Sequence, residues 1–542
     1  MSRAIRVEYL ILLFSVLMMA GYNHGLWSGI IQANDRLSLH TLLFLASCAV
    51  FLTALFNFLF NFLALKRVVK PALIVIVLSS AVASYFIDGY GVHIDTSMLQ
   101  NVLETDWAEA HELFTGRFLI HLFLWGMVPA WIIGRLEIRY SKWTRQLLIN
   151  VFSMLASVIV IGLIAVCFYQ DYASTFRNHR DLRYLINPTS YVYAAGKIIS
   201  QRFEQGQQPL IPISQQAALG YYAKNKKRRT IAVLVVGETA RAESFHMNGY
   251  SRQTTPRLEQ TAVLNFPHVT ACGTATAISV PCMFSMFPHD DYDDAKGHGY
   301  ESVLDVVAAA GEQVVWLDNN SGCKGVCDRV EHKKIIHMGL PQGCQDGDCF
   351  DEALLPALKQ SVASHDGDML VVLHQKGSHG PAYYQRVPAA FRKFEPVCET
   401  AELQDCSREQ IVNAYDNTIL YTDYVLSEII GWLQTRADEE NTAMLYVSDH
   451  GESLGESNFY LHGAPYLFAP QQQKQVPMLL WLSDNFQQDY RLDGQCLKAR
   501  QQDELSHDNL FHSLLGMMDI QLPGKYDPDL DLFADCRSGT GA

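Results

Sequence analysis

The stretch Ala271–Ser285 has the sequence ACGTATAISVPCMFS and places small and hydroxyl-bearing residues between Cys272 and Cys282. In an oxidising compartment these two cysteines would close a small disulfide-bonded loop. A hydroxyl held beside a metal ion is a nucleophile, whereas without the metal the stretch is a surface turn with ordinary threonines. The rest of the chain therefore has to supply the metal, the base and the compartment. The hydroxyls in question are those of Thr274, Thr276 and Ser279.

The composition predicts a membrane part followed by a soluble part. At 542 residues the chain is longer than one ordinary domain, so two or more domains are expected. The net charge of −14 and the pI near 5.7 show no basic excess, which argues against a nucleic-acid partner. The hydrophobic share of 49% is ordinary, but long apolar runs are concentrated in the first 170 residues.

Five apolar runs approach the length of about 20 residues that a membrane-spanning helix needs. They cover residues 9–31, 40–65, 69–87, 118–133 and 147–169. The first run resembles a signal peptide because arginines precede it, but four more runs follow and no cleavage site is clear, so an anchor is expected. Positive charge predicts the orientation, since all three clusters fall on one side, which is the cytoplasm. The clusters are Arg3 and Arg6, then Lys66, Arg67 and Lys70, then Arg135, Arg139, Lys142 and Arg145.

This topology places the loop 88–117 and everything after Tyr169 outside the cytoplasm. The loop carries NVLETDW at 101–107, which is either an interfacial helix anchored by Trp107 or a set of polar groups that meets a lipid head group. Helical patterning around 191–203 predicts an amphipathic helix on the membrane surface, followed by a basic run at 224–229. We therefore expect a five-helix transmembrane domain at 1–170, a connector at 171–229 and a catalytic domain at 230–542.

From Thr230 onward, short apolar runs alternate with helical or turn-rich stretches. The runs are apolar on both faces, which is typical of a central, mostly parallel sheet covered by helices. In such sheets the chemistry gathers beyond the carboxyl ends of the strands. The predicted strands are 231–236, 314–317, 369–373, 444–447 and 478–482.

Twelve cysteines are present, and ten of them lie in the soluble half. An even count in an external domain predicts five disulfides, although the connectivity stays open; a thiolate metal site is the alternative, but the spacing is not that of zinc motifs. The other two, Cys48 and Cys167, lie within predicted spans. The ten are the close pairs Cys272 and Cys282, Cys323 and Cys327, Cys344 and Cys349, Cys398 and Cys406, and then Cys496 and Cys536.

Polar residues follow three of the predicted strands at the expected end. Carboxylates and imidazoles from separate strand ends suit zinc or a related divalent ion, whereas the alternative is ordinary loop residues and hydrogen-bonded histidines. A metal near the hydroxyls of the opening stretch would acidify one of them, and Lys324 and backbone N–H groups would balance charge on a phosphoryl group. The pattern therefore predicts phosphoryl or phosphodiester transfer. The candidate residues are Glu238, His379, Asp449, His450 and His462.

Six motifs together resemble the lipid A phosphoethanolamine transferases of Gram-negative bacteria, within the alkaline-phosphatase/sulfatase-like superfamily. The resemblance spans nearly the whole chain and implies an alkaline-phosphatase-like α/β fold for the soluble domain. This chain departs from the commoner CGTST by having Ala275 between the threonines, a small-for-small change that we expect to be harmless. The motifs are GETARAE, CGTATAISVPCMFS, DNNSGCKGVCDR, HQKGSHGPAYY, SDHGESLGE and LHG.

The resemblance implies a role for each matched residue. Thr276 matches the nucleophile, and its oxygen completes a zinc site whose other ligands match Glu238, Asp449 and His450. His379 and His462 match residues that hold the substrate phosphate or a second zinc, and one of them protonates the departing alcohol. The resemblance further assigns the donor head group to Asn101, Thr105, Glu109, Asn320, Ser321, Lys324 and His374.

The resemblance also implies a two-step transfer of phosphoethanolamine from phosphatidylethanolamine to a phosphate of lipid A. It implies a monomer in the inner membrane with its catalytic domain in the periplasm, and resistance to polymyxin through lower surface charge. The alternatives are another acceptor (a core sugar or a periplasmic glucan), a phosphoglycerol transferase or phosphodiesterase of the same fold, and a binding or sensor protein on an inactive scaffold. A sulfatase is disfavoured because Cys282-Met-Phe-Ser lacks the C/S-x-P-x-R context.

Overall fold

The computed structural model describes residues 4–33, 38–105, 107–205, 209–340, 343–345, 348–456 and 459–538. The chain divides into two compact units. Unit 1 comprises Met1–Leu99 and Leu113–Lys197, and unit 2 comprises Gln100–Glu112 and Ile198–Ala542. The segment Gln100–Glu112 therefore belongs to unit 2, although the chain on both sides of it belongs to unit 1. The three-part division at residues 170 and 229 stays a prediction.

Unit 1 is helical, and among the described residues it has four helices long and apolar enough to cross a membrane. They are α3 (Leu39–Asn61), α4 (Val69–Tyr90), the continuous stretch Gly116–Arg135 that contains α7 (Gly116–His121) and α8 (Val128–Arg135), and α9 (Trp143–Cys167). A fifth span results if α1 (Val7–Gly21) and α2 (His24–Gln32) cross the membrane together. These helices confirm the predicted apolar anchor.

The first predicted span differs from the expectation because it is bent. The sequence predicts one continuous run at 9–31, but α1 and α2 meet at an angle of 54°. Asn23 lies at the bend, where its Nδ2 donates to the carbonyl oxygens of Met18 at 2.8 Å and Asn187 at 2.7 Å. The side-chain amide thereby takes over a backbone acceptor at the end of α1 and stabilises the break.

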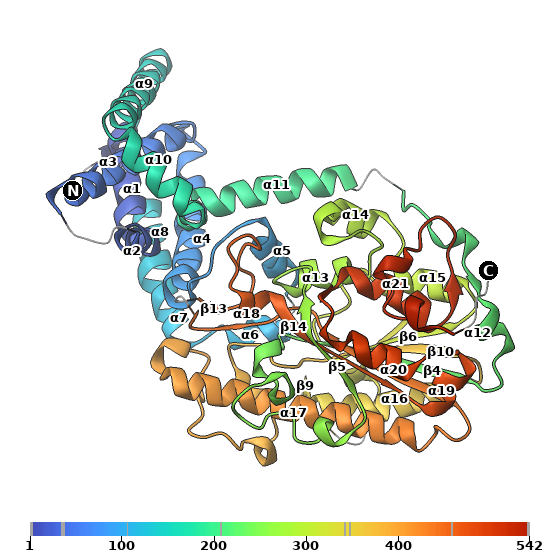
Figure 1. The fold of residues 1–542 in the computed structure, drawn as a ribbon. Coiled ribbons are helices and arrows are strands. Elements are labelled where there is room, and N and C mark those ends of the chain that lie inside the picture. Colours follow the sequence, from blue (N-terminus) through green and yellow to red (C-terminus); the bar gives the residue numbers. More distant parts are fainter. Residues whose placement is uncertain are drawn as a thin grey trace. The chain divides into compact units, whose positions relative to one another are not determined.

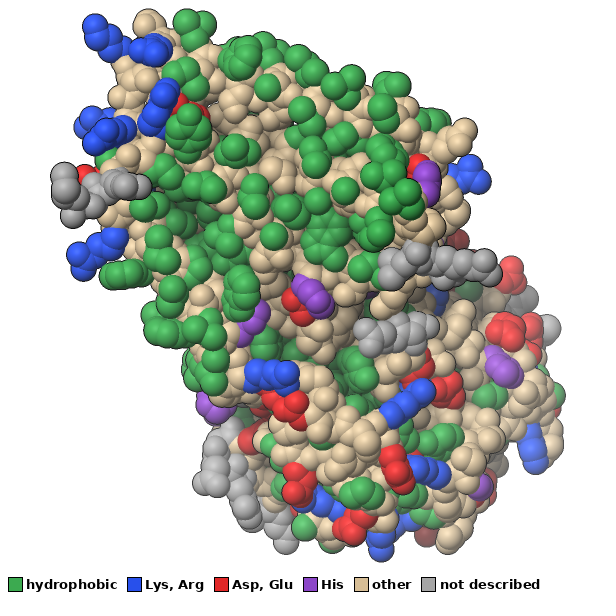
Figure 2. Space-filling model, turned by 90° about the vertical axis from the view of Figure 1, so that its left-hand side faces the viewer, with side chains coloured by type: hydrophobic (Ala, Val, Ile, Leu, Met, Phe, Trp, Pro, Cys, Tyr) green, Lys and Arg blue, Asp and Glu red, His purple; other side chains and the backbone are tan. Residues whose placement is uncertain are grey.

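The surface of unit 1 is apolar, as a lipid-facing surface requires. Figure 2 shows hydrophobic side chains spread over the upper part of the molecule. On α9 the side chains of Phe152 and Val166 are 75% and 81% exposed, whereas Asn57 of α3 is buried. Its Nδ2 donates to the hydroxyls of Ser153 and Ser157 at 3.0 and 2.9 Å, which ties α3 to α9. Hydrogen bonds between helices are a common means of association in a bilayer.

A long helix, α11 (Thr189–Gln205), covers the stretch where the sequence predicts an amphipathic helix. Its side chains at Val192, Ile199 and Phe203 recur at helical spacing and are 54%, 69% and 73% exposed. An exposed apolar stripe of this kind is typical of a helix that lies in a membrane interface. Its position on the membrane stays a prediction.

Unit 2 is built on an eight-stranded sheet in the order β15-β5-β14-β11-β4-β10-β6-β7. All neighbouring pairs are parallel except those made by β14, which runs opposite to β11 and β5. The five predicted strands correspond to β4, β6, β10, β11 and β14, so the mostly parallel sheet is confirmed. The strands are β4 (Thr230–Gly237), β5 (Leu264–Thr270), β6 (Gln313–Asp318), β7 (Glu331–Lys334), β10 (Met369–His374), β11 (Asn441–Ser448), β14 (Gln475–Leu482) and β15 (Leu505–Ser506).

Helices cover both faces of this sheet (Figure 1). One face carries α13 (Thr276–Met283), α15 (Val303–Ala309) and α21 (Asp508–Met517). The other carries α16 (Leu354–Ala363) and α17 (Arg408–Gln434), whose first turn is closed by a capping box between Ser407 and Gln410. Every residue of β4, β10 and β11 is buried, so the central strands form the core of unit 2.

Five disulfides join the ten cysteines of unit 2, which confirms the expected number. Four close short loops, and the fifth spans forty residues. The two remaining cysteines, Cys48 and Cys167, are free thiols. The pairs are Cys272–Cys282, Cys323–Cys327, Cys344–Cys349, Cys398–Cys406 and Cys496–Cys536.

Loss of the longest disulfide should lower the stability of unit 2 the most. The Cys496–Cys536 bridge joins residues 40 positions apart, so restriction of the unfolded chain predicts about 4 kcal/mol of stabilisation. The Cys398–Cys406 bridge joins residues 8 positions apart, for which the same relation gives about 2.5 kcal/mol. Thermal unfolding of the two double Cys→Ser variants checks this order. A melting temperature of the Cys496/Cys536 variant equal to or above that of the Cys398/Cys406 variant would contradict it.

Candidate active site

The sheet brings three of the predicted ligands together at the carboxyl ends of β4 and β11. Gly237 pairs with Ser448 in the register, so Glu238 and the pair Asp449 and His450 leave the sheet side by side. Ligand atoms of these three residues lie within 4.8 Å of one another. All three side chains are buried, with exposures of 0–1%.

The hydroxyl of Thr276 lies against this cluster. Thr276 is the first residue of α13, and its Oγ1 lies 3.2 and 3.3 Å from the two carboxylate oxygens of Glu238. The same Oγ1 is 3.3 Å from Nε2 of His450. The hydroxyl therefore occupies the position of a fourth ligand at the start of a helix, where backbone N–H groups favour negative charge.

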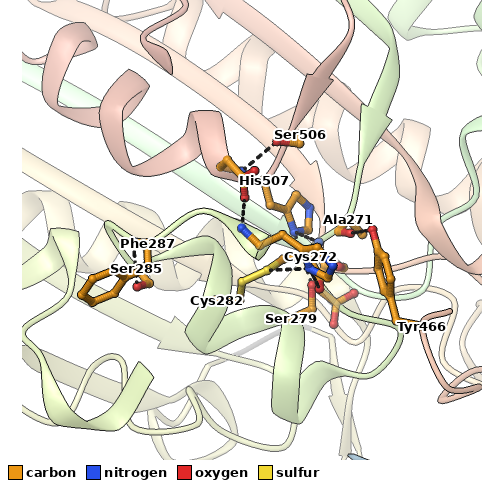
Figure 3. Close-up of a disulfide and its surroundings, with 12 residues drawn as sticks. Ala271, Cys272, Ser279, Cys282, Ser285, Phe287, Tyr466, Ser506 and His507 are labelled. Carbon is orange, nitrogen blue, oxygen red and sulfur yellow. Dashed lines mark hydrogen bonds between the residues drawn. A yellow bond between two sulfur atoms is a disulfide. The ribbon is translucent and has the colours of Figure 1, made fainter. Parts of the chain in front are cut away.

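The loop before α13 is held by the Cys272–Cys282 disulfide (Figure 3). Gly273 is required in this loop because a Cβ there would come within 2.9 Å of the backbone nitrogen of Ser279. His507, at the end of β15, lies beside the loop in Figure 3 and joins it to β11. Its Nδ1 accepts from the backbone N–H of Cys272 at 3.1 Å, and its Nε2 lies 2.9 Å from the carbonyl oxygen of Ser448. The loop is thus fixed to the strand that carries Asp449.

The other two hydroxyls of the opening stretch are engaged with the backbone. Thr274 Oγ1 donates to the carbonyl oxygen of Ala464 at 2.7 Å. Ser279 Oγ donates to the carbonyl oxygen of Asp449 in a short hydrogen bond. Of the three hydroxyls that the sequence leaves open, the structure places that of Thr276 beside Glu238 and His450.

The donor set at this cluster fits a divalent metal ion. Asp449 Oδ1 accepts from the backbone N–H groups of Thr239 and His450, but Oδ2 is buried and accepts no hydrogen bond from the described residues. Burial lowers the pKa of His450 to about 4, so its imidazole is neutral. Nδ1 donates to the carbonyl oxygen of Gly451 at 2.9 Å, which leaves the lone pair of Nε2 facing the carboxylates. Two carboxylates, one imidazole and one hydroxyl are a ligand set that zinc accepts.

His379 and His462 lie next to this cluster. The ring of His462 is 4.6 Å from that of His450 and 5.2 Å from that of His379, measured between centroids. Nδ1 of His462 is 3.4 Å from Oε1 of the buried Glu452. The five candidates from three strand ends therefore come together at one place.

Four of the residues matched to the donor head group lie in unit 2, with Asn320, Ser321 and Lys324 in the loop after β6 and His374 at the end of strand β10. Asn320 Nδ2 donates to Glu238 at 2.6 Å, and Lys324 Nζ donates to Ser321 Oγ at 3.0 Å. His374 is completely buried, so it supports the site from behind. Its Nδ1 donates to Asp318 at 2.8 Å, and its Nε2 lies 3.3 Å from Asn320 Nδ2. A line of hydrogen bonds therefore runs from Asp318 through His374 and Asn320 to Glu238.

The other matched residues lie in the segment Gln100–Glu112, which belongs to unit 2. Lys324 Nζ donates to the carbonyl oxygen of Glu104 at 3.1 Å, which links this segment to the 318–329 loop. Thr105 Oγ1 donates to the carbonyl oxygen of Asn101 at 2.8 Å. The side chain of Glu109 lies outside the described part of the structure.

Three non-glycine residues at the site adopt a left-handed backbone. Thr239 has φ of 53°, Lys324 has φ of 51° and Leu461 has φ of 63°. Each conformation costs about 1–3 kcal/mol and is typical of functional sites, where the surrounding structure enforces it. The three residues include Lys324 itself and direct neighbours of Glu238 and His462.

Two residues that support the site, Asp318 and Asp351, were not predicted from the sequence. Asp351 accepts from the backbone N–H groups of Lys376 and Gly377 at 2.8 and 2.9 Å and so shapes the loop that carries His379. Asp318 ends the buried strand β6, and a carboxylate at that point was a usable signal. Asp351 offered none, because its partners are backbone groups 25 and 26 residues away.

Comparisons with known proteins agree with this geometry. A family model for phosphoethanolamine transferase EptA/EptB matches residues 52–203, and the sulfatase model matches residues 230–520. Phosphoethanolamine transferase EptA of Escherichia coli is 41% identical over 95% of this chain and 94% of that protein. Phosphatidylethanolamine transferase Mcr-1 of Escherichia coli is 41% identical over 77% of this chain and 79% of that protein.

A solved structure resembles the chain over its full length. It is the integral membrane protein lipooligosaccharide phosphoethanolamine transferase A (EptA) from Neisseria meningitidis, with a TM-score of 0.95 and 37% sequence identity. The match covers 99% of this chain and 100% of that chain. Together with the apolar helices of unit 1, it identifies a multi-pass membrane protein. The chain therefore belongs to the EptA family of phosphoethanolamine transferases, whose soluble domain has the alkaline-phosphatase/sulfatase-like fold.

Proposed function

We propose that this protein is a zinc-dependent enzyme that transfers phosphoethanolamine from phosphatidylethanolamine to a phosphate of lipid A. The observation that carries the proposal is the position of the Thr276 hydroxyl against the buried cluster of Glu238, Asp449 and His450. Family membership, at 41% identity over nearly the whole chain, supports the substrate class.

The first step forms a covalent intermediate on Thr276. Its Oγ1 gives its proton to water and attacks the phosphorus of the donor, and the bond from phosphorus to the glycerol oxygen breaks. Diacylglycerol leaves with a proton from His379 or His462 and remains in the membrane. Backbone N–H groups at the start of α13 and the Lys324 ammonium stabilise the charge on the transferring group.

The second step releases the intermediate to the acceptor. An oxygen of the lipid A phosphate attacks the same phosphorus, the bond from phosphorus to Thr276 Oγ1 breaks, and the hydroxyl recovers its proton. Zinc held by Glu238, Asp449, His450 and Thr276 would lower the pKa of the threonine hydroxyl, which makes it a nucleophile at neutral pH. In this proposal His379 and His462 also hold the substrate phosphate or a second zinc.

The membrane anchor fits this chemistry because donor and acceptor are both lipids. We infer a monomer in the inner membrane with unit 2 in the periplasm, where its five disulfides are stable. The added group is zwitterionic and its positively charged amine lowers the net negative charge of the product, so weaker binding of cationic peptides such as polymyxin is the expected consequence.

Mass spectrometry of lipid A tests the acceptor. Cells that express the wild-type protein should show lipid A with an added phosphoethanolamine, and label from ethanolamine-labelled phosphatidylethanolamine should appear in it. The matched control is the same strain with an empty plasmid. Label in core sugar or in periplasmic glucan, with unmodified lipid A, would replace the acceptor. Transfer of phosphoglycerol would replace the donor.

A further inference from the structure

The segment Gln100–Glu112 is fastened to unit 2 by polar contacts at both of its ends. Gln100 Nε2 donates to Asp294 Oδ1 at 2.8 Å. At the other end, Glu112 forms a short ion pair with the guanidinium of Arg386. Lys324 holds the backbone between them through the carbonyl oxygen of Glu104. The segment carries Asn101 and Thr105, which the family resemblance matches to the donor head group.

Of these contacts, the one made by Arg386 is connected most directly to the active site, because Arg386 also bonds His379. Its side chain is only 3% exposed and that of Glu112 is 14% exposed, so the pair is shielded from water. Nη2 of Arg386 bonds Glu112, while Nε donates to the carbonyl oxygen of His379 at 2.9 Å. A buried guanidinium needs both an opposite charge and an oriented acceptor, and the planar group fixes the two relative to each other.

The residue held by Arg386 is one of the two histidines beside the nucleophile. The ring of His379 lies 5.2 Å from that of His462, and both side chains are nearly buried. The backbone N–H of His379 donates to the carbonyl oxygen of Lys376, so Arg386 supplies a second contact to the main chain of the same residue. A displacement of Glu112 would therefore move the His379 main chain through a single rigid side chain.

We propose that Arg386 is a positioning residue that places His379 correctly only when Glu112 and its segment are seated on unit 2. The proposal rests on the proposed function, in which His379 or His462 gives a proton to the leaving alcohol, and it takes His379 as that donor. The donor-binding segment and the acid that completes the reaction are then assembled by one ion pair. Arg386 itself does not touch the reacting atoms.

The test uses the full-length protein in detergent micelles that contain phosphatidylethanolamine. Glu112→Gln keeps the shape of the side chain and removes its charge, and it should lower kcat by about tenfold through misplacement of His379. Arg386→Lys keeps a positive charge but loses the planar fork, and it should have a similar effect. Glu399→Gln is the matched control, because Glu399 is 67% exposed and its partner Arg392, 3.0 Å away, is 30% exposed.

A double-mutant cycle separates positioning from a general loss of structure. In a His379→Ala background, Glu112→Gln should change kcat by less than about twofold, because the group it positions is gone. A drop by the same factor in both backgrounds would overturn the proposal. A kcat within twofold of wild type for Glu112→Gln would also overturn it.

Amide hydrogen exchange gives a readout that does not depend on activity. In Glu112→Gln, amides of residues 376–386 should exchange faster together with those of residues 100–112, while Glu399→Gln leaves both unchanged. Unchanged exchange at 376–386 would refute the tie to His379. If His379→Ala retains full activity, the proton-donor role in the proposed function fails, and the exchange result alone then decides whether Arg386 ties the two segments.

Discussion

Thr276→Val should abolish transfer to lipid A, with a loss of more than about a thousandfold. The change removes the hydroxyl but keeps the branched shape of the side chain at the first position of α13. No other hydroxyl of the loop is placed to replace it, since those of Thr274 and Ser279 donate to backbone carbonyls. Mass spectrometry of lipid A from expressing cells measures the loss.

The covalent intermediate provides a second measurement of the same prediction. Wild-type protein mixed with phosphatidylethanolamine and no acceptor should gain the mass of one phosphoethanolamine, located on the peptide that contains Thr276. Thr276→Val should gain none, and Thr276→Ser should gain it more slowly because a hydroxyl remains. The same adduct on Thr276→Val protein would disprove the nucleophile assignment.

Thr274→Val is the matched control for this experiment. Its hydroxyl bonds the carbonyl oxygen of Ala464 at 2.7 Å, so the substitution leaves a buried acceptor unpaired and should cost about 1–3 kcal/mol of stability. The variant should still form the adduct. A threonine two residues away in the same loop thus separates loss of the loop from loss of the reacting group.

The main strands of unit 2 were predictable because they are apolar on both faces. Strands β4, β10 and β11 are completely buried, and an uninterrupted apolar run is enough to find them. Strand β7 was not predicted, because it is an edge strand with the polar sequence EHKK, in which only the first residue is half-buried. Strand β5 was not predicted because it contains Pro267 and only Phe266 and Val269 of its seven residues are buried.

The site was predictable where chemistry sits directly after a strand, as for Glu238 and Asp449. The contacts of the site that depend on the order of strands in the sheet were not predictable. His374 meets Asp318 because β10 pairs with β6 in a register that sets these two residues opposite each other. Sequence periodicity contains no information on which strands become neighbours. The same limit hid the membership of Gln100–Glu112 in unit 2, since the chain on either side of it belongs to the helical unit.

Removing a ligand carboxylate should empty the metal site. In the absence of metal, the variant should be at least as stable as metal-free wild-type protein. Wild-type protein is expected to retain zinc through gel filtration, whereas Asp449→Asn and Glu238→Gln should retain little, as measured by elemental analysis. At a free zinc concentration of one hundred times Kd, binding stabilises the folded state by about 2.7 kcal/mol. The thermal shift on adding zinc should therefore disappear in both variants.

Without metal, Asp449→Asn should not lower the stability of the protein, and the reason lies in the hydrogen bonds of Asp449. An asparagine there keeps an Oδ1 that accepts from the backbone N–H groups of Thr239 and His450. It replaces Oδ2, a buried atom with no hydrogen-bond donor among the described residues, by a neutral amide beside Glu238. Because one of two neighbouring buried charges is removed, metal-free Asp449→Asn should melt at or above the temperature of metal-free wild type.

A buried carboxylate outside the site shows whether this behaviour is specific. Asp531 is 2% exposed, accepts from Tyr526 Oη and the backbone N–H of Phe533, and burial raises the pKa of its carboxyl to about 6. Asp531→Asn should keep both the bound zinc and the zinc-dependent thermal shift. If Asp449→Asn keeps its zinc, or if it melts well below metal-free wild type, then Asp449 holds the fold together and the metal site is wrong. Only a metal ligand is a buried carboxylate that destabilises the metal-free fold and is also required for zinc binding.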